Sequence, residues 1–173
     1  MRDFARGDGA TIVMASSVDE KFPPEHMLDG KDSTFWMTTG MFPQEFVLAL
    51  RTNVHISKIT TLSLNVKKLC VEKCESDKPD SFEKLFEVEL ANRGDRLQTE
   101  VHQVNIRAKY LRFIMLSGHG EFASMNRVSV VGESAAGEDG GLEGGEEEEG
   151  ARTGLKGTGN SFNRAAYIAD DLK

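Results

Sequence analysis

The fold is decided around residues 29–36, which read DGKDSTFW. Two acidic residues, a turn glycine, a threonine and two aromatic residues fall within these eight positions. Carboxylate, hydroxyl and backbone carbonyl oxygens gathered in such a turn are the ligands that a hard cation prefers. The pattern therefore predicts a cation-holding loop that runs directly into a strand, with Phe35 and Trp36 leading into the core.

The predicted ligands of this cation are the side-chain oxygens of Asp29 and Thr34, with carbonyls near His26 and Lys31. Ca²⁺ takes roughly six to eight oxygens, many of them backbone carbonyls, and would be a structural ion here. The alternative is an ordinary turn in which Asp29 caps the backbone and Thr34 begins a strand. Composition alone leaves both interpretations open.

Charge is distributed unevenly along the chain. The formal net charge is −7, yet residues 133–150 contain eight acidic residues and no basic one. The first 132 residues hold 17 Lys and Arg against 18 Asp and Glu, so the body is nearly neutral. A nearly neutral body lacks the basic face that nucleic-acid binding requires, so we expect no nucleic-acid partner.

The N-terminal residues are charged where a signal peptide would be apolar, and no run reaches the roughly 18 apolar residues of a spanning helix. We therefore expect a protein of the cytosol or of a space continuous with it, without direct membrane insertion. Cys70 and Cys74 would lie on one face of a strand about 13 Å apart, too far for a disulfide. Reduced thiols are the favoured interpretation and a redox pair the alternative.

Short apolar or alternating runs separated by turn residues recur from end to end of the body. Two prolines, Pro23 and Pro24, interrupt the pattern, and Pro24 can begin one helical turn over residues 25–28. The side-chain parity of the third run switches at Lys67 and Lys68, which predicts a β-bulge or a turn there. The predicted strands are residues 10–17, 46–50, 56–72, 82–90, 101–106, 110–117 and 128–131.

About seven or eight short strands without a convincing helical period predict an all-β sandwich. The final assignment is an eight-stranded antiparallel jelly roll over residues 1–132. Residues 133–173 are predicted to be a disordered, acidic, Gly/Glu-rich tail, because they cannot offset ordering entropy by burial. Within the tail, residues 161–172 have the spacing of a weak helix, and a frayed end is the alternative.

The motif Asp29-Gly30-x-x-x-Thr34-x-Trp36 resembles the calcium loop of galactose-binding-like, or discoidin-like, jelly-roll domains. The resemblance implies that Asp29 and Thr34 are metal ligands. Members of that superfamily close the site with a carbonyl and a glutamate just before the final strand. Here that place holds Asn126 and Arg127, and an arginine cannot replace a carboxylate, so only the carbonyl of Asn126 remains as a ligand.

A closer resemblance covers residues 10–132 in one register. Residues 15–25 (ASSVDEKFPPE), 38–46 (TTGMFPQEF), 110–114 (YLRFI) and 122–124 (FAS) resemble the small galactose-binding-like subunits of intraflagellar transport complex B. This family implies a non-enzymatic cargo adaptor of the cytoplasm and cilium. It also implies a heterodimer with a Rab-like small GTPase of the complex (intraflagellar transport protein twenty-seven) and contacts with other complex B subunits.

The segment most typical of an interface is residues 38–42. Thr38 begins it, and Met41 and Phe42 follow a turn glycine and precede Pro43, so their apolar side chains would be exposed unless another surface covers them. We expect Thr38, Met41 and Phe42 to contact the partner. The alternative is that the segment folds back over the end of the sandwich as a plug.

Catalytic functions find no support in the sequence. No supported nucleophile and base pair is present, and the four histidines are dispersed without the spacing of a zinc site. The main alternative to an adaptor is a calcium-stabilised carbohydrate- or lipid-binding module, since related folds bind glycans with loops at one end of the sandwich. The expected burial of Trp36, the only tryptophan, disfavours that alternative because glycan sites usually stack sugars on exposed aromatic rings.

Overall fold

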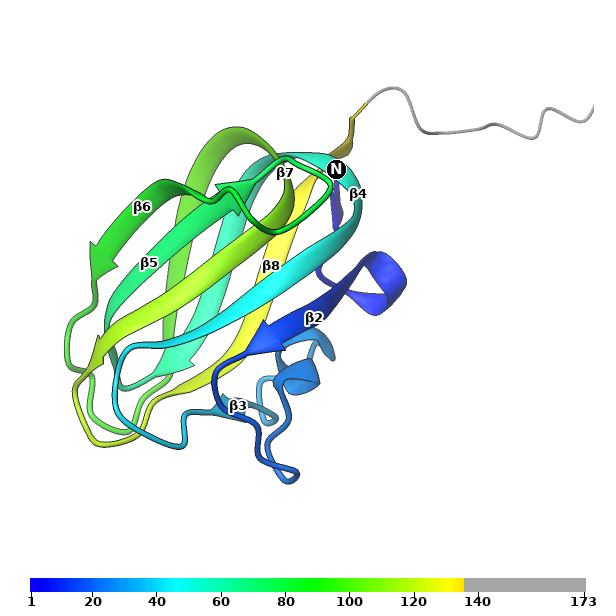
Figure 1. Ribbon diagram of the computed structural model, residues 1–173. Helices are drawn as coiled ribbons and strands as arrows, with labels where there is room; N and C mark the ends of the chain where they lie inside the picture. The colour runs from blue at the N-terminus through cyan, green and yellow to red at the C-terminus, as the bar shows by residue number, and fades with distance from the viewer. Residues whose placement is uncertain (136–173) are drawn as a thin grey trace, which may run out of the picture. The chain divides into compact units, whose positions relative to one another are not determined.

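The computed structural model describes residues 1–135, and these form a β-sandwich built from eight strands (Figure 1). The elements in chain order are β1 (Arg2–Asp3), η1 (Gly7–Gly9), β2 (Ala10–Ala15), η2 (Pro24–Leu28), β3 (Trp36–Met37), β4 (Gln44–Leu64), β5 (Val66–Cys74), β6 (Glu83–Glu89), β7 (Gln98–Gly118) and β8 (Ser124–Ser134). Every strand pairing is antiparallel. The predicted eight-stranded antiparallel jelly roll is therefore confirmed.

Two of the predicted features lie outside residues 1–135. The tail and its helix at residues 161–172 lie outside the described residues. Residues 1–135 include no helix long and apolar enough to cross a membrane. The last strand, β8, continues to Ser134, slightly past the expected domain boundary at residue 132.

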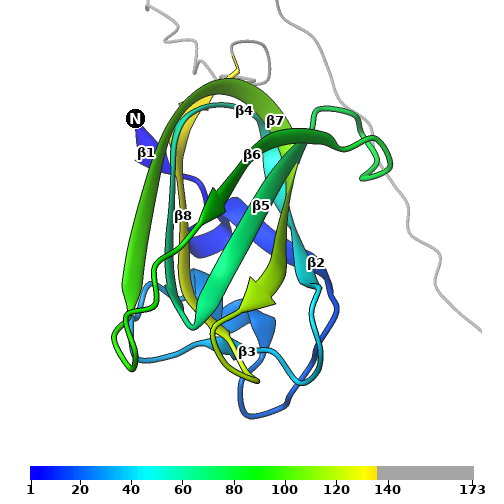
Figure 2. The same cartoon turned by 90° about the vertical axis from the view of Figure 1, so that its left-hand side faces the viewer.

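Two long strands, β4 and β7, belong to both layers of the sandwich. The first half of β4 pairs with β2 and with the second half of β7, whereas its second half pairs with β8 and with the first half of β7. Figures 1 and 2 show both strands arching from one layer to the other at the same end of the molecule. The expected division of β4 at residues 51–53 and of β7 at residues 107–109 was wrong, because both strands bend there without ending.

The turn between β4 and β5 is made by Asn65, which has a positive φ of 59°. Asparagine tolerates this left-handed conformation better than most residues, so a single residue can reverse the chain without glycine or proline. The expectation of one strand over residues 56–72 was therefore wrong at Asn65. The predicted irregularity at Lys67 and Lys68 is confirmed, because the β5–β7 register shifts on both sides of Lys68.

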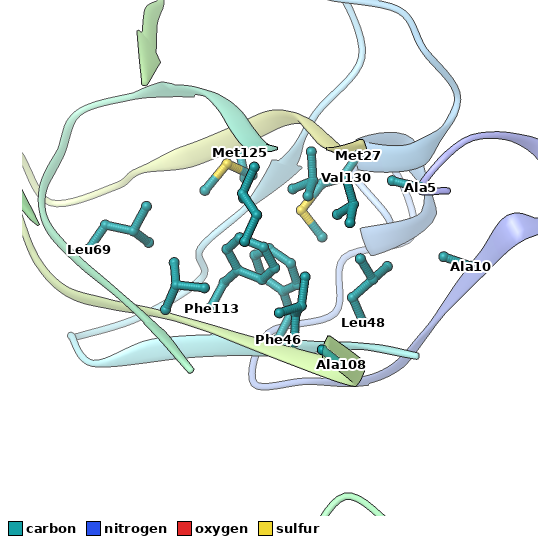
Figure 3. Close-up of a cluster of buried hydrophobic side chains, with 14 of the residues drawn as sticks. Ala5, Ala10, Met27, Phe46, Leu48, Leu69, Ala108, Phe113, Met125 and Val130 are labelled. Atoms are coloured by element: carbon teal, nitrogen blue, oxygen red, sulfur yellow. The ribbon is translucent and has the colours of Figure 1, made fainter. Parts of the chain in front are cut away.

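Aromatic rings fill the space between the layers. Phe46 of β4 and Phe113 of β7 stack with ring centroids 4.8 Å apart, and Trp36 meets Phe46 edge to face at 5.4 Å (Figure 3 shows Phe46 and Phe113). Met27 of η2 and Met125 of β8 close the same cluster, and all five side chains are fully buried. Burial of Trp36 is thus confirmed.

The short elements outside the long strands follow local rules. Residues 24–28 form a 3₁₀ turn with Pro24 near its start, as predicted, because the missing N–H of proline is not needed at that position. Cys70 and Cys74 are both buried free thiols, so the expectation of no disulfide between them is confirmed.

Candidate functional site

The acidic loop before β3 brings four oxygens together. The Thr34 hydroxyl lies 3.0 and 2.8 Å from the two carboxylate oxygens of Asp29, and 3.4 Å from the carbonyl oxygen of Lys31. The Lys31 N–H donates to Asp29 Oδ1 at 2.8 Å, and Gly30 turns the chain between them with a φ of 80°. This arrangement is an Asx turn whose polar side has the donor type that a hard cation takes.

The carboxyl group of Asp29 is held in its charged form. Partial desolvation raises the pKa of Asp29, but the hydrogen bonds from the Lys31 N–H and the Thr34 hydroxyl, with the charges of Lys31 and His26, outweigh it and lower the pKa overall. A carboxyl group with a lowered pKa suits cation binding. It also suits the simpler role of capping the turn.

His26 and Asn126 lie beside the loop, and their side chains hydrogen-bond groups other than those four oxygens. His26 Nδ1 is 3.3 Å from the carbonyl oxygen of Phe35. Asn126 donates through Nδ2 to the Asp32 carbonyl at 2.9 Å and accepts from the Ser124 hydroxyl at 3.0 Å, where the β4–β8 register shifts. Only a backbone carbonyl of either residue remains to complete a cation shell.

Arg127 occupies the place where related domains were expected to have a glutamate, and it forms an ion pair with Asp32. The Arg127 side chain thus covers this side of the loop and provides no metal ligand. Within residues 1–135, His, Cys, Asp and Glu side chains do not gather in threes as a metal-ion cluster. The Asp29 carboxylate, the Thr34 hydroxyl and the Lys31 carbonyl have the donor type of a calcium site, but most of the shell would have to come from other carbonyls and water.

The side chain of Thr38 is not on the surface. Thr38 is fully buried, its backbone N–H donates to the Ala123 carbonyl at 3.0 Å, and its hydroxyl accepts from the Ala123 N–H at 3.0 Å. These bonds extend the short β3–β8 pairing by one residue. Thr38 therefore anchors the start of the 38–43 loop in the core, and its buried side chain is not available for contact with a partner.

Met41 and Phe42 behave in opposite ways, although both were expected at the interface. Met41 is 90% exposed, whereas Phe42 folds back and packs against the core cluster. The ring of Phe42 covers Gly118 so closely that a Cβ on that glycine would lie 2.5 Å from it. Phe42 therefore follows the plug alternative, whereas Met41 remains exposed.

A residue that sequence reasoning overlooked, Gln44, holds this loop. Its Oε1 accepts from the hydroxyls of Ser16 at 2.7 Å and Ser17 at 2.5 Å, and its Nε2 donates to the Met41 carbonyl at 2.8 Å. Ser17 also accepts the indole N–H of Trp36 through its carbonyl at 2.8 Å. The resulting chain of bonds runs from the core tryptophan to the backbone of Met41, so the exposed side chain sits on a fixed base.

The same end of the sandwich carries an apolar hollow of about 210 Å³. Phe122 and Leu97 on its rim are 53% and 42% exposed. The other apolar side chains in its lining belong to Phe35, Met37, Leu64 and Ala123. Sequence periodicity could not find this hollow, because its residues come from four separate segments.

Residues 12–128 match the family described as F5/8 type C domain. The chain is 76% identical over 133 residues to intraflagellar transport protein 25 of Chlamydomonas reinhardtii, covering 76% of this chain and 70% of that protein. It is 41% identical over 126 residues to the Homo sapiens intraflagellar transport protein 25 homolog, covering 72% and 88%.

Among solved structures, the fold is similar to two carbohydrate-binding modules. One is the family 32 module of Clostridium perfringens NanJ in complex with galactose, with a TM-score of 0.60, 19% identity, and coverage of 70% of this chain and 92% of that one. The other is chitosan-binding module 1 from a Paenibacillus chitosanase/glucanase, with a TM-score of 0.64, 18% identity, and coverage of 76% and 100%. At this level of identity the likeness concerns the fold.

Proposed function

This chain belongs to the F5/8 type C domain family and, within it, to the intraflagellar transport protein 25 proteins, and from this premise we propose that it is a non-enzymatic adaptor subunit of intraflagellar transport complex B. Its partner is a Rab-like small GTPase, with which it forms a heterodimer that links cargo to the complex. Other complex B subunits are further partners, and the protein works in the cytoplasm and the cilium. The observation that carries the proposal is the 76% identity with the Chlamydomonas protein.

The loop end of the sandwich is the surface that suits a protein partner. Met41 projects fully into solvent from a hydrogen-bonded base, and the rim of the apolar hollow exposes Phe122 and Leu97. Exposed methionine and aromatic side chains around a hollow are typical of protein interfaces. A rigid base reduces the ordering entropy that binding costs.

A structural calcium ion belongs to the same proposal. Asp29, Thr34 and the Lys31 carbonyl would hold it, with carbonyls near His26 and at Asn126 as further ligands. The ion would fix the loop that leads into β3, and through Trp36 and Ser17 it would steady the 38–43 loop. It is assigned no part in any reaction.

The heterodimer is tested by replacing Met41 with glutamate. The substitution should weaken binding to the purified Rab-like GTPase by about tenfold or more, because a carboxylate would have to be desolvated at an apolar contact. Isothermal titration calorimetry measures the affinity. The melting temperature should not change, since Met41 is 90% exposed and only its backbone carbonyl is bonded.

Val101→Glu provides the matched control, because Val101 is also an apolar side chain, 53% exposed, on β7. It should leave the affinity unchanged. If Met41→Glu and Val101→Glu have the same small effect, Met41 does not belong to the interface. If ciliated-cell extract yields no GTPase in one-to-one complex with the wild-type chain, the adaptor proposal fails.

The apolar hollow favours one second candidate, a calcium-stabilised carbohydrate- or lipid-binding module. Phe35 and Phe122 line the hollow with aromatic surface, and one fold relative was solved with galactose. Retention on a galactose column that Phe122→Ala abolishes, without any protein partner, would support this candidate. No retention would exclude galactose as the ligand.

A further inference from the structure

A second pocket lies near the point where β4 bends from one layer to the other. It has a volume of about 280 Å³. Its walls come from the N-terminal segment and from the bend of β4, namely Arg2, Asp3, Phe4, Arg6, Asp8, Gly9, Arg51 and Thr52. None of the side chains assigned above to the cation loop, the 38–43 loop or the apolar hollow takes part.

The charges around this pocket leave an excess of positive charge. Three arginines line it against two aspartates, and one aspartate is already engaged. Asp3 accepts the N–H groups of Ala5 at 3.0 Å and Val130 at 2.9 Å, and its other oxygen lies 3.5 Å from Arg6 Nε. Asp3 therefore belongs to the wall, where it positions Arg6 instead of neutralising the whole pocket.

Two of the guanidinium groups have no carboxylate partner among residues 1–135. Arg2 lies over the ring of Phe4, with its central carbon 4.3 Å from the ring centroid. This stacking fixes the guanidinium plane and leaves its N–H edges available. The Arg51 side chain makes no hydrogen bond or ion pair within the described region, in contrast to Arg112 on β7, which pairs with Glu72 and Glu45.

The shape and the polar groups indicate the class of ligand. Guanidinium groups bind phosphate through paired N–H donors, and three of them line this pocket. A volume of about 280 Å³ exceeds the needs of a lone ion and approaches that of small-ligand sites. The Thr52 hydroxyl and the Asp8 carboxylate, which forms no ion pair within residues 1–135, would hydrogen-bond hydroxyl groups of the ligand.

We propose that the pocket of Arg2, Arg6 and Arg51 binds a phosphorylated polyol, either free or as the headgroup of a lipid. The arginines take the phosphate groups, and Thr52 and Asp8 take ring hydroxyls. This site goes beyond the adaptor role, since it lies apart from the loop end proposed for the GTPase. It would give the chain a second recognition surface for small anionic groups.

The test uses the full chain and inositol hexakisphosphate in isothermal titration calorimetry. We expect one-to-one binding that weakens as salt is raised. Arg51→Ala should reduce the affinity by about tenfold or more, and Arg51→Lys should reduce it less, because lysine keeps the charge and loses the fork. Arg93→Ala is the matched control, since Arg93 is exposed and forms no ion pair within residues 1–135.

A flotation assay with phosphatidylcholine vesicles, with and without phosphatidylinositol bisphosphate, distinguishes the two sources. Binding to the loaded vesicles that depends on Arg51 identifies a lipid headgroup, and binding of the soluble polyol alone identifies a free ligand. The proposal is overturned if neither binds, or if Arg51→Ala and Arg93→Ala have the same effect. A phosphoserine peptide that binds more tightly than the polyol with the same Arg51 dependence would overturn the choice of a polyol.

The controls separate this site from the GTPase interface. The melting temperature of Arg51→Ala should match that of the wild type, because the exposed Arg51 side chain forms no hydrogen bond or ion pair within residues 1–135. Met41→Glu should leave polyol binding unchanged, and Arg51→Ala should leave GTPase binding unchanged. Loss of both activities in either variant would contradict two separate surfaces.

Discussion

Trp36 connects the sequence motif, the core and the exposed loop in one side chain. Its indole ring lies against Phe46 in the buried cluster, and its N–H satisfies the carbonyl of the buried Ser17. Ser17 in turn contacts Gln44, whose amide holds the backbone of Met41. A buried residue thereby determines where a surface residue stands.

Replacing Trp36 with phenylalanine should destabilise the fold by about 2–4 kcal/mol, because it leaves a cavity and an unpaired buried carbonyl. Urea unfolding followed by far-UV circular dichroism measures the loss, since Trp36 is the only tryptophan available for fluorescence. Phe35→Leu is the comparison, because the ring of Phe35 is only partly buried where it stacks on Phe22. A change below about 1 kcal/mol for Trp36→Phe would contradict this account.

The calcium proposal is also decided by single residues. Excess Ca²⁺ should raise the melting temperature and a chelator should reverse the rise, because a ligand that binds only the folded state stabilises it, by about 2.7 kcal/mol at 100-fold excess over Kd. Thr34→Val keeps the side-chain shape and removes the hydroxyl that contacts Asp29, so the calcium-dependent rise should disappear. Thr99→Val, on the exposed side of β7, should retain it. Equal melting temperatures with calcium and with chelator would show that the loop is only a turn.

At the scale of elements, β6 and the first half of β7 meet through Phe86 and His102. Their rings stack with centroids 3.9 Å apart, and His102 Nε2 is buried without a hydrogen-bond partner in the described region. Burial lowers the pKa of His102 because it disfavours the imidazolium form, and nearby Glu100 only partly opposes this effect. The contact therefore favours a neutral imidazole.

Stability should fall as the pH decreases below about 6.5. Above that value His102 is neutral in both states, and below it the unfolded chain binds the proton first because the folded pKa is lower. His102→Leu should flatten the decline measured by urea unfolding between about pH 6.5 and 5, and His55→Leu, at an exposed position, should not. Glu87, whose pKa two lysines lower to about 2, contributes its own loss only in more acidic solution. An unchanged profile for His102→Leu would refute this role.

Sequence patterns predicted the strands better than their ends. Alternation located the apolar parts of β4 and β7, yet Arg51 and Asn53 have the composition of a turn and lie in a continuous bent strand. A turn and a bend use the same polar residues, and only long-range pairing with β7 and β8 separates them. Asn65 was missed for the opposite reason, because one asparagine with positive φ reversed the chain.

The candidate site was predicted where it is local in sequence. Asp29, Thr34 and Lys31 do come together, since five residues and a glycine turn determine their distances. Thr38 was expected at the interface but is buried, because its position depends on the register between β3 and β8. Spacing along the chain carries no information on such a pairing.

At the scale of the whole molecule, the two layers should unfold as one unit. Hydrogen exchange of the native state should give the same opening free energy for Phe46 and Leu48 in one layer as for Ile56 and Ile59 in the other, because β4 carries all four into one core. Two-dimensional NMR measures these rates. Opening of one group at a free energy lower by more than about 1 kcal/mol would show that the layers are separate cooperative units.

The passage of β4 and β7 through both layers has a mechanical consequence. A force that pulls the two layers apart acts along extended backbone at the bends instead of on a slack loop, so it must break the ladders with β2, β5 or β8 before the layers can shear. Two partners bound at opposite ends of this sandwich would be connected by the continuous backbone of β4 and β7. The fold therefore forms a stiff connection between its two ends.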